Sequence, residues 1–121
     1  MKKNPLVSVI IPTKNEEKNI VRCLKSIKKQ KYHESIEIIL VDNNSVDKTV
    51  EFAKPYITKV ITKGPERSAQ RNVGARMAKG KWLLFIDADM ELSRDVIEEC
   101  LGLAKNRTLT PIVTITEQSI G

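Results

Sequence analysis

The sequence has no long hydrophobic run, and its apolar segments, such as Leu6 to Ile11, have only the length of a strand. A helix that crosses a membrane needs about 18 or more apolar residues in a row, so none is predicted. The same segment is too short for the apolar part of a secretory signal, and no small-residue cleavage site follows it. We therefore expect a cytoplasmic protein.

Aromatic residues make up only 4% of the chain, so few rings are present on which nucleic-acid bases could stack. Glycine-rich phosphate loops are also missing. No G-x-G-x-x-G occurs, and the segment after the first apolar stretch, Pro12 to Glu16, contains no glycine. These absences argue against a dinucleotide oxidoreductase and make a nucleotidyltransferase a less favoured alternative. No nucleic-acid partner is expected.

Cysteine is scarce, and the two cysteines, Cys23 and Cys100, are far apart in the sequence. Neither has a second ligand at the spacing of a metal site. Each falls on an apolar stripe with helical spacing, which predicts two reduced cysteines packed in the core.

The chain has fewer acidic residues than basic ones, 15 against 21, which gives a formal net charge of +6. A basic balance favours contact with phosphates or with an anionic membrane surface. The densest basic cluster is Lys25, Lys28, Lys29 and Lys31. Its simplest interpretation is a solvated helix end that complements the helix dipole, and peripheral membrane contact is a second hypothesis.

Apolar periodicity predicts strands that alternate with helices. Strands are predicted at residues 6–11, 36–41, 57–61, 81–86 and 110–116, and helices at residues 16–29, 46–53, 68–78 and 93–105, with Ser93 as the cap of the last helix. Strands that are apolar along their whole length indicate a mainly parallel sheet with helices on both faces. We expect one α/β domain over residues 1–121.

Polar turns follow three of these strands, at residues 12–16, 42–45 and 87–89. Since ligands of such sheets bind outside the carboxyl ends of the strands, these turns are predicted to form the site. The first two turns also fit a capping box and a turn that leads into a helix cap. The third, Asp87-Ala88-Asp89, holds one carboxylate more than a strand end needs. The pair suits Mg²⁺ or Mn²⁺ with a diphosphate that supplies further oxygen ligands.

The basic counterpart is the segment 64–80, just before the fourth predicted strand. In a helix, Arg67 and Arg71 lie one turn apart on one face, where two guanidinium groups suit a phosphate or the edge of a base. The apolar stripe of this helix is predicted at Ala69, Val73 and Met77. Solvated surface arginines are the simpler alternative.

Three segments, "VSVIIPTKNEEKNIVRCLKSI", "IEIILVDNNSVDKT" and "RSAQRNVGARMAKGKWLLFIDADM", carry a resemblance in order and spacing. They resemble the donor-binding N-terminal portion of the family 2 glycosyltransferases, which have a Rossmann-like GT-A fold and use nucleotide-diphospho-sugars with inversion at the transferred sugar. The resemblance implies a UDP- or GDP-sugar as donor and a divalent metal, Mn²⁺ or Mg²⁺, as cofactor. Asp87-Ala88-Asp89 looks like the family's D-x-D motif, with Asp87 and Asp89 on the metal. The residues that the resemblance places around the donor are Pro12, Thr13, Glu16, Asp42, Arg67, Arg71, Asp87 and Ala88.

Two departures from the family pattern leave questions open. Asn43 stands where a second aspartate is common, so the base of the nucleotide stays undetermined. The family also has a second half that binds the acceptor and supplies the general base, and this chain is expected to lack it and to be a fragment. Glu117 is the one late candidate for the base. A non-catalytic nucleotide-sugar-binding module is therefore the alternative function.

Overall fold

The computed structural model describes residues 5–31, 35–105 and 112–114. Five strands form one parallel sheet in the order β3-β2-β1-β4-β5. The strands are β1 (Val7–Thr13), β2 (Ile36–Asp42), β3 (Lys59–Thr62), β4 (Trp82–Phe85) and β5 (Ile112–Thr114). The helices are α1 (Ile20–Lys28), α2 (Thr49–Ala53), which a 3₁₀ turn at Lys54–Tyr56 extends, α3 (Arg67–Met77) and α4 (Val96–Lys105).

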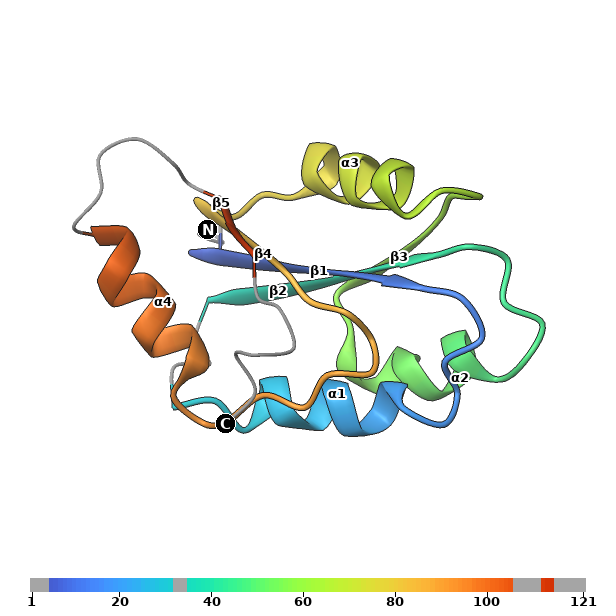
Figure 1. Ribbon diagram of the computed structural model, residues 1–121, viewed down its shortest axis with the longest axis horizontal. Coiled ribbons are helices and arrows are strands. Elements are labelled where there is room, and N and C mark those ends of the chain that lie inside the picture. Colours follow the sequence, from blue (N-terminus) through green and yellow to red (C-terminus); the bar gives the residue numbers. More distant parts are fainter. Residues whose placement is uncertain (1–4, 32–34, 106–111, 115–121) are drawn as a thin grey trace.

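Helices cover both faces of the sheet, which confirms the predicted α/β class. Figure 1 shows α3 above the sheet and α1, α2 and α4 below it. The alternation of side chains along each strand explains the two layers. Val9 and Ile11 point into the larger core beside α1 and α4, whereas Ile10 points into a smaller core against α3.

The predicted helical stripe of α1 is confirmed, because Ile20, Cys23, Leu24 and Ile27 are all buried. Both cysteines are free thiols. Burial, together with the negative charges of Asp89 and Glu16, raises the pKa of Cys23 to about 12. The Cys23 thiol is therefore protonated and unreactive near neutral pH.

Several predicted element boundaries are wrong by about one turn. The helix predicted from residue 16 begins at Ile20 and the one predicted from residue 46 begins at Thr49. The turns that precede both helices are held instead by side-chain hydrogen bonds, which compete with helical ones. Helix α4 begins at Val96, so Ser93 does not cap it. In α3, Gln70 and Gly74 are the buried residues. The predicted 69/73/77 stripe is confirmed at Val73, which packs against the smaller core, and is wrong at Met77, which is 49% exposed.

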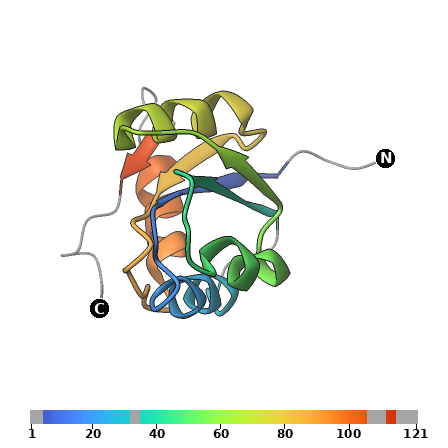
Figure 2. The same ribbon diagram turned by 90° about the vertical axis from the view of Figure 1, so that its right-hand side faces the viewer.

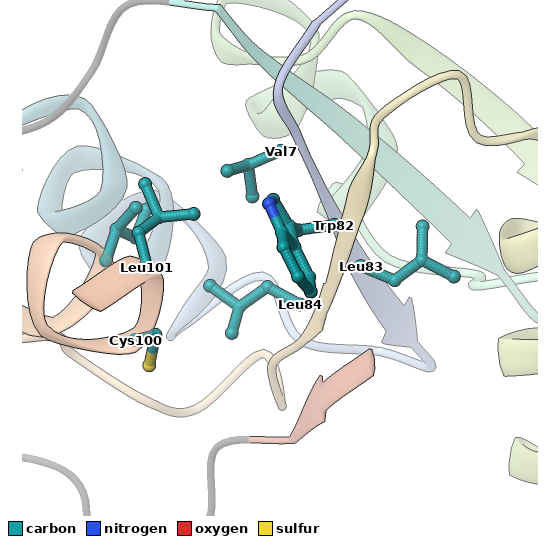
Figure 3. Close-up of a pocket in the computed structure, with 7 residues that line it drawn as sticks. Val7, Trp82, Leu83, Leu84, Cys100 and Leu101 are labelled. Carbon is teal, nitrogen blue, oxygen red and sulfur yellow. The ribbon is translucent and has the colours of Figure 1, made fainter. Parts of the chain in front are cut away.

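A small apolar hollow lies between β4 and α4 (Figure 3). Its lining consists of Val7, Trp82, Leu83, Leu84, Ile97, Cys100 and Leu101. The described part of this lining contains no carboxylate or amide side chain. The hollow therefore offers no ligand set for a metal or a nucleotide, and the functional site must be sought elsewhere.

Gly74 lets α3 approach the sheet closely. A Cβ atom at Gly74 would lie 2.6 Å from Ile10 Cγ2 and 3.1 Å from Val41 Cγ2. We expect Gly74→Ala to lower the free energy of unfolding by about 1–3 kcal/mol, the usual cost of overpacking. Gly102→Ala is the matched control, since among the described residues nothing lies within 4 Å of its added Cβ. Urea denaturation should show the control unchanged or stabilised by about 0.5–1 kcal/mol, and equal effects would contradict the tight contact.

Candidate functional site at the carboxyl edge of the sheet

The strand order brings the predicted turns together at one edge. From β1 the chain moves outward to β2 and β3, and it then returns to the other side of β1 with β4 and β5. The reversal between β1 and β4 is a topological switch point, where the crevice for a ligand forms in open parallel sheets. Residues 12–16 leave β1 and residues 87–89 leave β4 at this point. Figure 2 faces this edge of the molecule.

The turns after β1 and β2 are fastened to each other by hydrogen bonds. Thr13 Oγ1 donates to Asp42 Oδ1 (2.6 Å), and Ser45 donates to the same carboxylate through its backbone N–H and its hydroxyl. Asn15 closes the link, because its N–H donates to Ser45 Oγ and its Oδ1 accepts from Val46 N–H. These hydrogen bonds therefore hold the two turns in place in the absence of a ligand.

These contacts test the two structural interpretations of the turns, a capping box after β1 and a turn with a helix cap after β2. Thr13 is still part of β1 and bonds to Asp42, so the predicted capping box with Glu16 is wrong. The Asp42 turn is confirmed by the bond from Ser45 N–H, but the cap position of α2 is Lys48. Pro12 is buried, and half-buried Glu16 accepts a hydrogen bond from Asn19 Nδ2 (3.2 Å).

Asp87 forms ion pairs with both of the predicted arginines. Arg67 Nη1 and Arg71 Nη2 each lie 3.5 Å from Asp87 Oδ1. The Asp87 side chain is 35% exposed, and those of Arg67 and Arg71 are 55% and 40% exposed. The structure therefore places the predicted acidic and basic groups in one cluster at the switch point. Nε of Arg71 is buried without a hydrogen-bond partner among the described residues, so this guanidinium is incompletely satisfied where it lies.

The other two residues of the acidic turn have different surroundings. Asp89 is exposed, and within the described part of the chain its carboxylate forms neither a hydrogen bond nor an ion pair. Only its backbone carbonyl is engaged, by Arg22 Nη2 at 3.5 Å. Ala88 is 2% exposed and its methyl group packs in the larger core. Ala88 can meet a ligand only through its backbone.

Gln70 is a site residue that sequence reasoning missed. Its side chain is 4% exposed, and Nε2 donates to the carbonyl oxygens of Thr13 (3.0 Å) and Val41 (2.8 Å). It thereby fixes the first turns of α3 over the ends of β1 and β2, with Arg67 and Arg71 on either side of it in the sequence. A glutamine between two arginines gives no periodic signal, so only the fold reveals this role.

The donor atoms present fit a hard divalent cation. Among the residues that the structure describes, no group of three His, Cys, Asp or Glu side chains could hold a metal by itself. Two carboxylates at one turn suit Mg²⁺ or Mn²⁺, which commonly take one or two protein carboxylates and complete the octahedron with water and substrate phosphates. The open carboxylate of Asp89 is the better placed of the two, because Asp87 is already paired with arginines.

The strand order of the sheet and the polar turns at its carboxyl edge together define a Rossmann-like, nucleotide-binding type of α/β domain. The chain matches the family model described as "Glycosyl transferase family 2" over residues 8–120. The chain belongs to this family, which confirms the resemblance seen in the sequence.

Known proteins similar to this chain agree with that assignment. The glycosyltransferase AglE of Haloferax volcanii is 38% identical over 93 residues, which are 70% of this chain and 31% of AglE. The structure of S. aureus TarS in complex with UDP-GlcNAc superimposes with a TM-score of 0.70 at 30% identity, over 83% of this chain and 31% of that one. The mannosyltransferase PcManGT of Pyrobaculum calidifontis, in complex with GDP-Man and Mn²⁺, gives a TM-score of 0.71 at 27% identity, over 82% and 32% of the two chains. The chain thus spans about a third of AglE, of PcManGT and of the 1–349 segment of TarS, and 19% of the longer TarS chain.

Some predictions lie beyond what the structure describes. Glu117 is outside the described residues, so its role as a base stays a prediction, as does the cytoplasmic location. No helix in the described ranges is long and apolar enough to span a bilayer.

Asp42 offers a test of how strongly the edge is held. It is 4% exposed and its carboxylate accepts three hydrogen bonds from Thr13 and Ser45. We expect Asp42→Asn to lower the free energy of unfolding by about 1.5–3 kcal/mol, the range for hydrogen bonds to a charged group. Urea denaturation measures this, with exposed Glu51→Gln as control. An unchanged stability with lost nucleotide binding would show that Asp42 serves the ligand alone.

Proposed function

We propose that this chain is the donor-binding part of an inverting glycosyltransferase that transfers a sugar from a nucleotide-diphospho-sugar. The observation that carries the proposal is the cluster of Asp87, Asp89, Arg67 and Arg71 at the switch point of the sheet. Cationic side chains and a divalent metal both suit the oxygens of a diphosphate, and this cluster supplies groups for each. UDP-GlcNAc and GDP-Man in the TarS and PcManGT structures support a nucleotide-sugar as the ligand.

The nucleoside is assigned to the turns after β1 and β2. Pro12 and Thr13 would form the floor of the pocket and Glu16 its side, while Asp42 would accept a hydrogen bond from the base. Asp42 has the capacity, because a carboxylate offers about four acceptor positions and three are used internally. Ala88 would contribute backbone atoms next to the ribose.

Asp87 and Asp89 would hold the divalent cation, Mn²⁺ or Mg²⁺, against the diphosphate. When bound, such an ion stabilises the negative charge that develops on the departing nucleoside diphosphate. Arg67 and Arg71 neutralise Asp87 in the free protein. The oxygens of an arriving diphosphate offer the two guanidinium groups stronger partners, and their move would release Asp87 for the metal.

Transfer itself is a single displacement. A hydroxyl oxygen of the acceptor attacks the anomeric carbon, the bond to the diphosphate oxygen breaks with its electron pair, and the hydroxyl proton passes to a general base. Glu117 is the candidate for that base within this chain. We propose that residues 1–121 form one donor-binding unit and that the acceptor is bound mainly by other residues of a longer protein. A non-catalytic nucleotide-sugar-binding module is the second candidate, and transfer by the longer protein would exclude it.

The test is a thermal-shift panel of UDP-, GDP- and dTDP-sugars, each with and without Mn²⁺. A nucleotide-sugar at a hundredfold excess over its dissociation constant stabilises the fold by about 2.7 kcal/mol, which corresponds to several degrees in a domain of this size. We expect one nucleotide class to give such a shift. No shift with any of them, at concentrations up to millimolar, would contradict the proposal.

A further inference from the structure

A hollow with a basic lining lies on the solvent side of α1, next to the connection between β4 and α4. It is lined by Val21, Arg22, Lys25, Ser26, Lys29, Glu91, Leu92 and Arg94. A second hollow adjoins it and is lined by Lys28, Lys29, Gln30, Lys31 and Arg94. Lys29 and Arg94 belong to both linings, so the two hollows are neighbours, and we call them together the basic groove.

The cations of the basic groove are not neutralised by neighbouring acids. Within the described part of the chain, Lys25, Lys28, Lys29 and Arg94 form no ion pair, and Lys31 alone pairs with a carboxylate, that of Asp95 at 3.1 Å. All of these basic side chains are exposed. Of the residues that the structure describes, Glu91 is the single acidic one in the lining.

The dipole of α1 does not account for this arrangement. It favours cations in the last turn, where Lys25 and Lys28 lie. Arg94, however, comes from the connection before α4, and a backbone hydrogen bond from Lys31 N–H to its carbonyl holds that connection against the end of α1 (2.9 Å). Arg22 lies in the first turn, where a cation is unfavourable for the dipole. Two separate segments therefore place their cations around one hollow.

The shape and composition of the basic groove favour a chain with phosphate groups over other anions. A flat bilayer would meet a convex surface with apolar anchors, but the large exposed hydrophobic residues of the described chain, Val46, Val60 and Met77, are not part of either lining. Proteins that bind single-stranded nucleic acid commonly stack its bases on aromatic rings, and among the described residues neither lining contains one. Arginine and lysine together suit phosphate oxygens.

We propose that the basic groove is a second anion site, which binds a flexible ligand bearing several phosphate groups. The groove begins where Arg22 donates to the backbone carbonyl of Asp89, so one end of such a ligand would lie beside the donor edge. This position is that of an acceptor, an assignment that rests on the proposed function. The binding itself does not depend on it.

The first experiment uses short-chain inorganic polyphosphate as the probe, titrated calorimetrically into the protein at low salt with a chelator to remove metals. We expect the triple variant Lys25→Gln/Lys29→Gln/Arg94→Gln to bind polyphosphate at least about tenfold more weakly than the wild type. The matched control is Lys48→Gln/Lys54→Gln/Arg76→Gln, which removes the same charge from exposed positions outside the groove. It should weaken binding by less than about threefold. Equal losses in both variants would show non-specific attraction to a basic protein and would overturn the proposal.

Further measurements separate the groove from the donor edge and from other partners. Arg71→Gln should leave polyphosphate binding to the basic groove intact. The groove triple variant should keep the rise in melting temperature that a nucleotide-sugar produces, so the two proposed sites are tested separately. Polyphosphate binding that disappears in Arg71→Gln would assign the anion to the donor edge and overturn the proposal. Tighter binding to vesicles of anionic lipid or to a single-stranded oligonucleotide than to polyphosphate, lost in the groove variant, would also overturn it by assigning a different partner.

Discussion

Asp89→Asn is expected to abolish the mutual strengthening between nucleotide and metal while leaving metal-free nucleotide binding intact or improved. The carboxylate of Asp89 is exposed and has no cationic partner among the described residues. It would therefore repel a diphosphate unless a metal ion lay between them. In the wild type, nucleotide-sugar plus Mn²⁺ should raise the melting temperature by more than the two separate shifts combined. Differential scanning fluorimetry with each ligand alone and together measures this excess.

A matched control keeps this result specific. Exposed Glu98→Gln removes the same charge from α4, away from the turn, and should retain the full excess shift. Asp89→Asn that keeps the metal dependence, or a wild type without any, would contradict a metal site at Asp87 and Asp89.

The double variant Arg67→Gln/Arg71→Gln is expected to change metal and nucleotide binding in opposite directions. The double variant removes both guanidinium groups from Asp87 Oδ1 and leaves that carboxylate unpaired. Each exposed ion pair is worth up to about 1 kcal/mol, so Mn²⁺ alone should bind about threefold to thirtyfold more tightly. The nucleotide-sugar loses two charge-assisted contacts of about 1.5–3 kcal/mol each and should bind at least about 100-fold more weakly. Calorimetric titrations with Mn²⁺ alone and with nucleotide-sugar report the two effects separately.

Arg76→Gln is the control on the same helix, because Arg76 is exposed and forms no ion pair with a described residue. It should leave both affinities within about twofold. If the double variant weakened metal binding as well, Arg67 and Arg71 would be supports of Asp87 rather than its competitors.

The sequence predicted the parallel sheet and the edge of the site because those depend on strong, local signals. Short, mainly apolar segments such as Ile36 to Val41, which is interrupted only by Glu37, favour buried strands, and Asp87-Ala88-Asp89 follows the end of another. The helix starts were predicted less well, since the turns at Asn15 and Asn44 take left-handed backbone conformations, with φ of 52° and 49°. Asparagine tolerates this conformation, but which asparagine adopts it depends on partners elsewhere in the fold.

The details of the site depend on contacts between distant segments, which periodicity does not reveal. Met77 fits an apolar stripe with Val73, yet the close approach of Gly74 to Ile10 turns α3 so that Gln70 faces inward and Met77 faces solvent. In this orientation of α3, Arg67 and Arg71 reach Asp87. Helical spacing therefore placed the arginines and Val73 correctly and Met77 incorrectly, because the close contact at Gly74 helps decide which face of α3 packs.

The fastening of the turns after β1 and β2 has a consequence for the thermodynamics of ligand binding. Thr13, Asn15, Asp42 and Ser45 are held in place by one another before a nucleotide arrives. Ordering a free loop costs about 1–2 kcal/mol of conformational entropy per residue, a penalty that this edge meets during folding instead of during association. The affinity of the nucleoside end should consequently depend little on loop closure, and selection among bases should resemble a rigid fit.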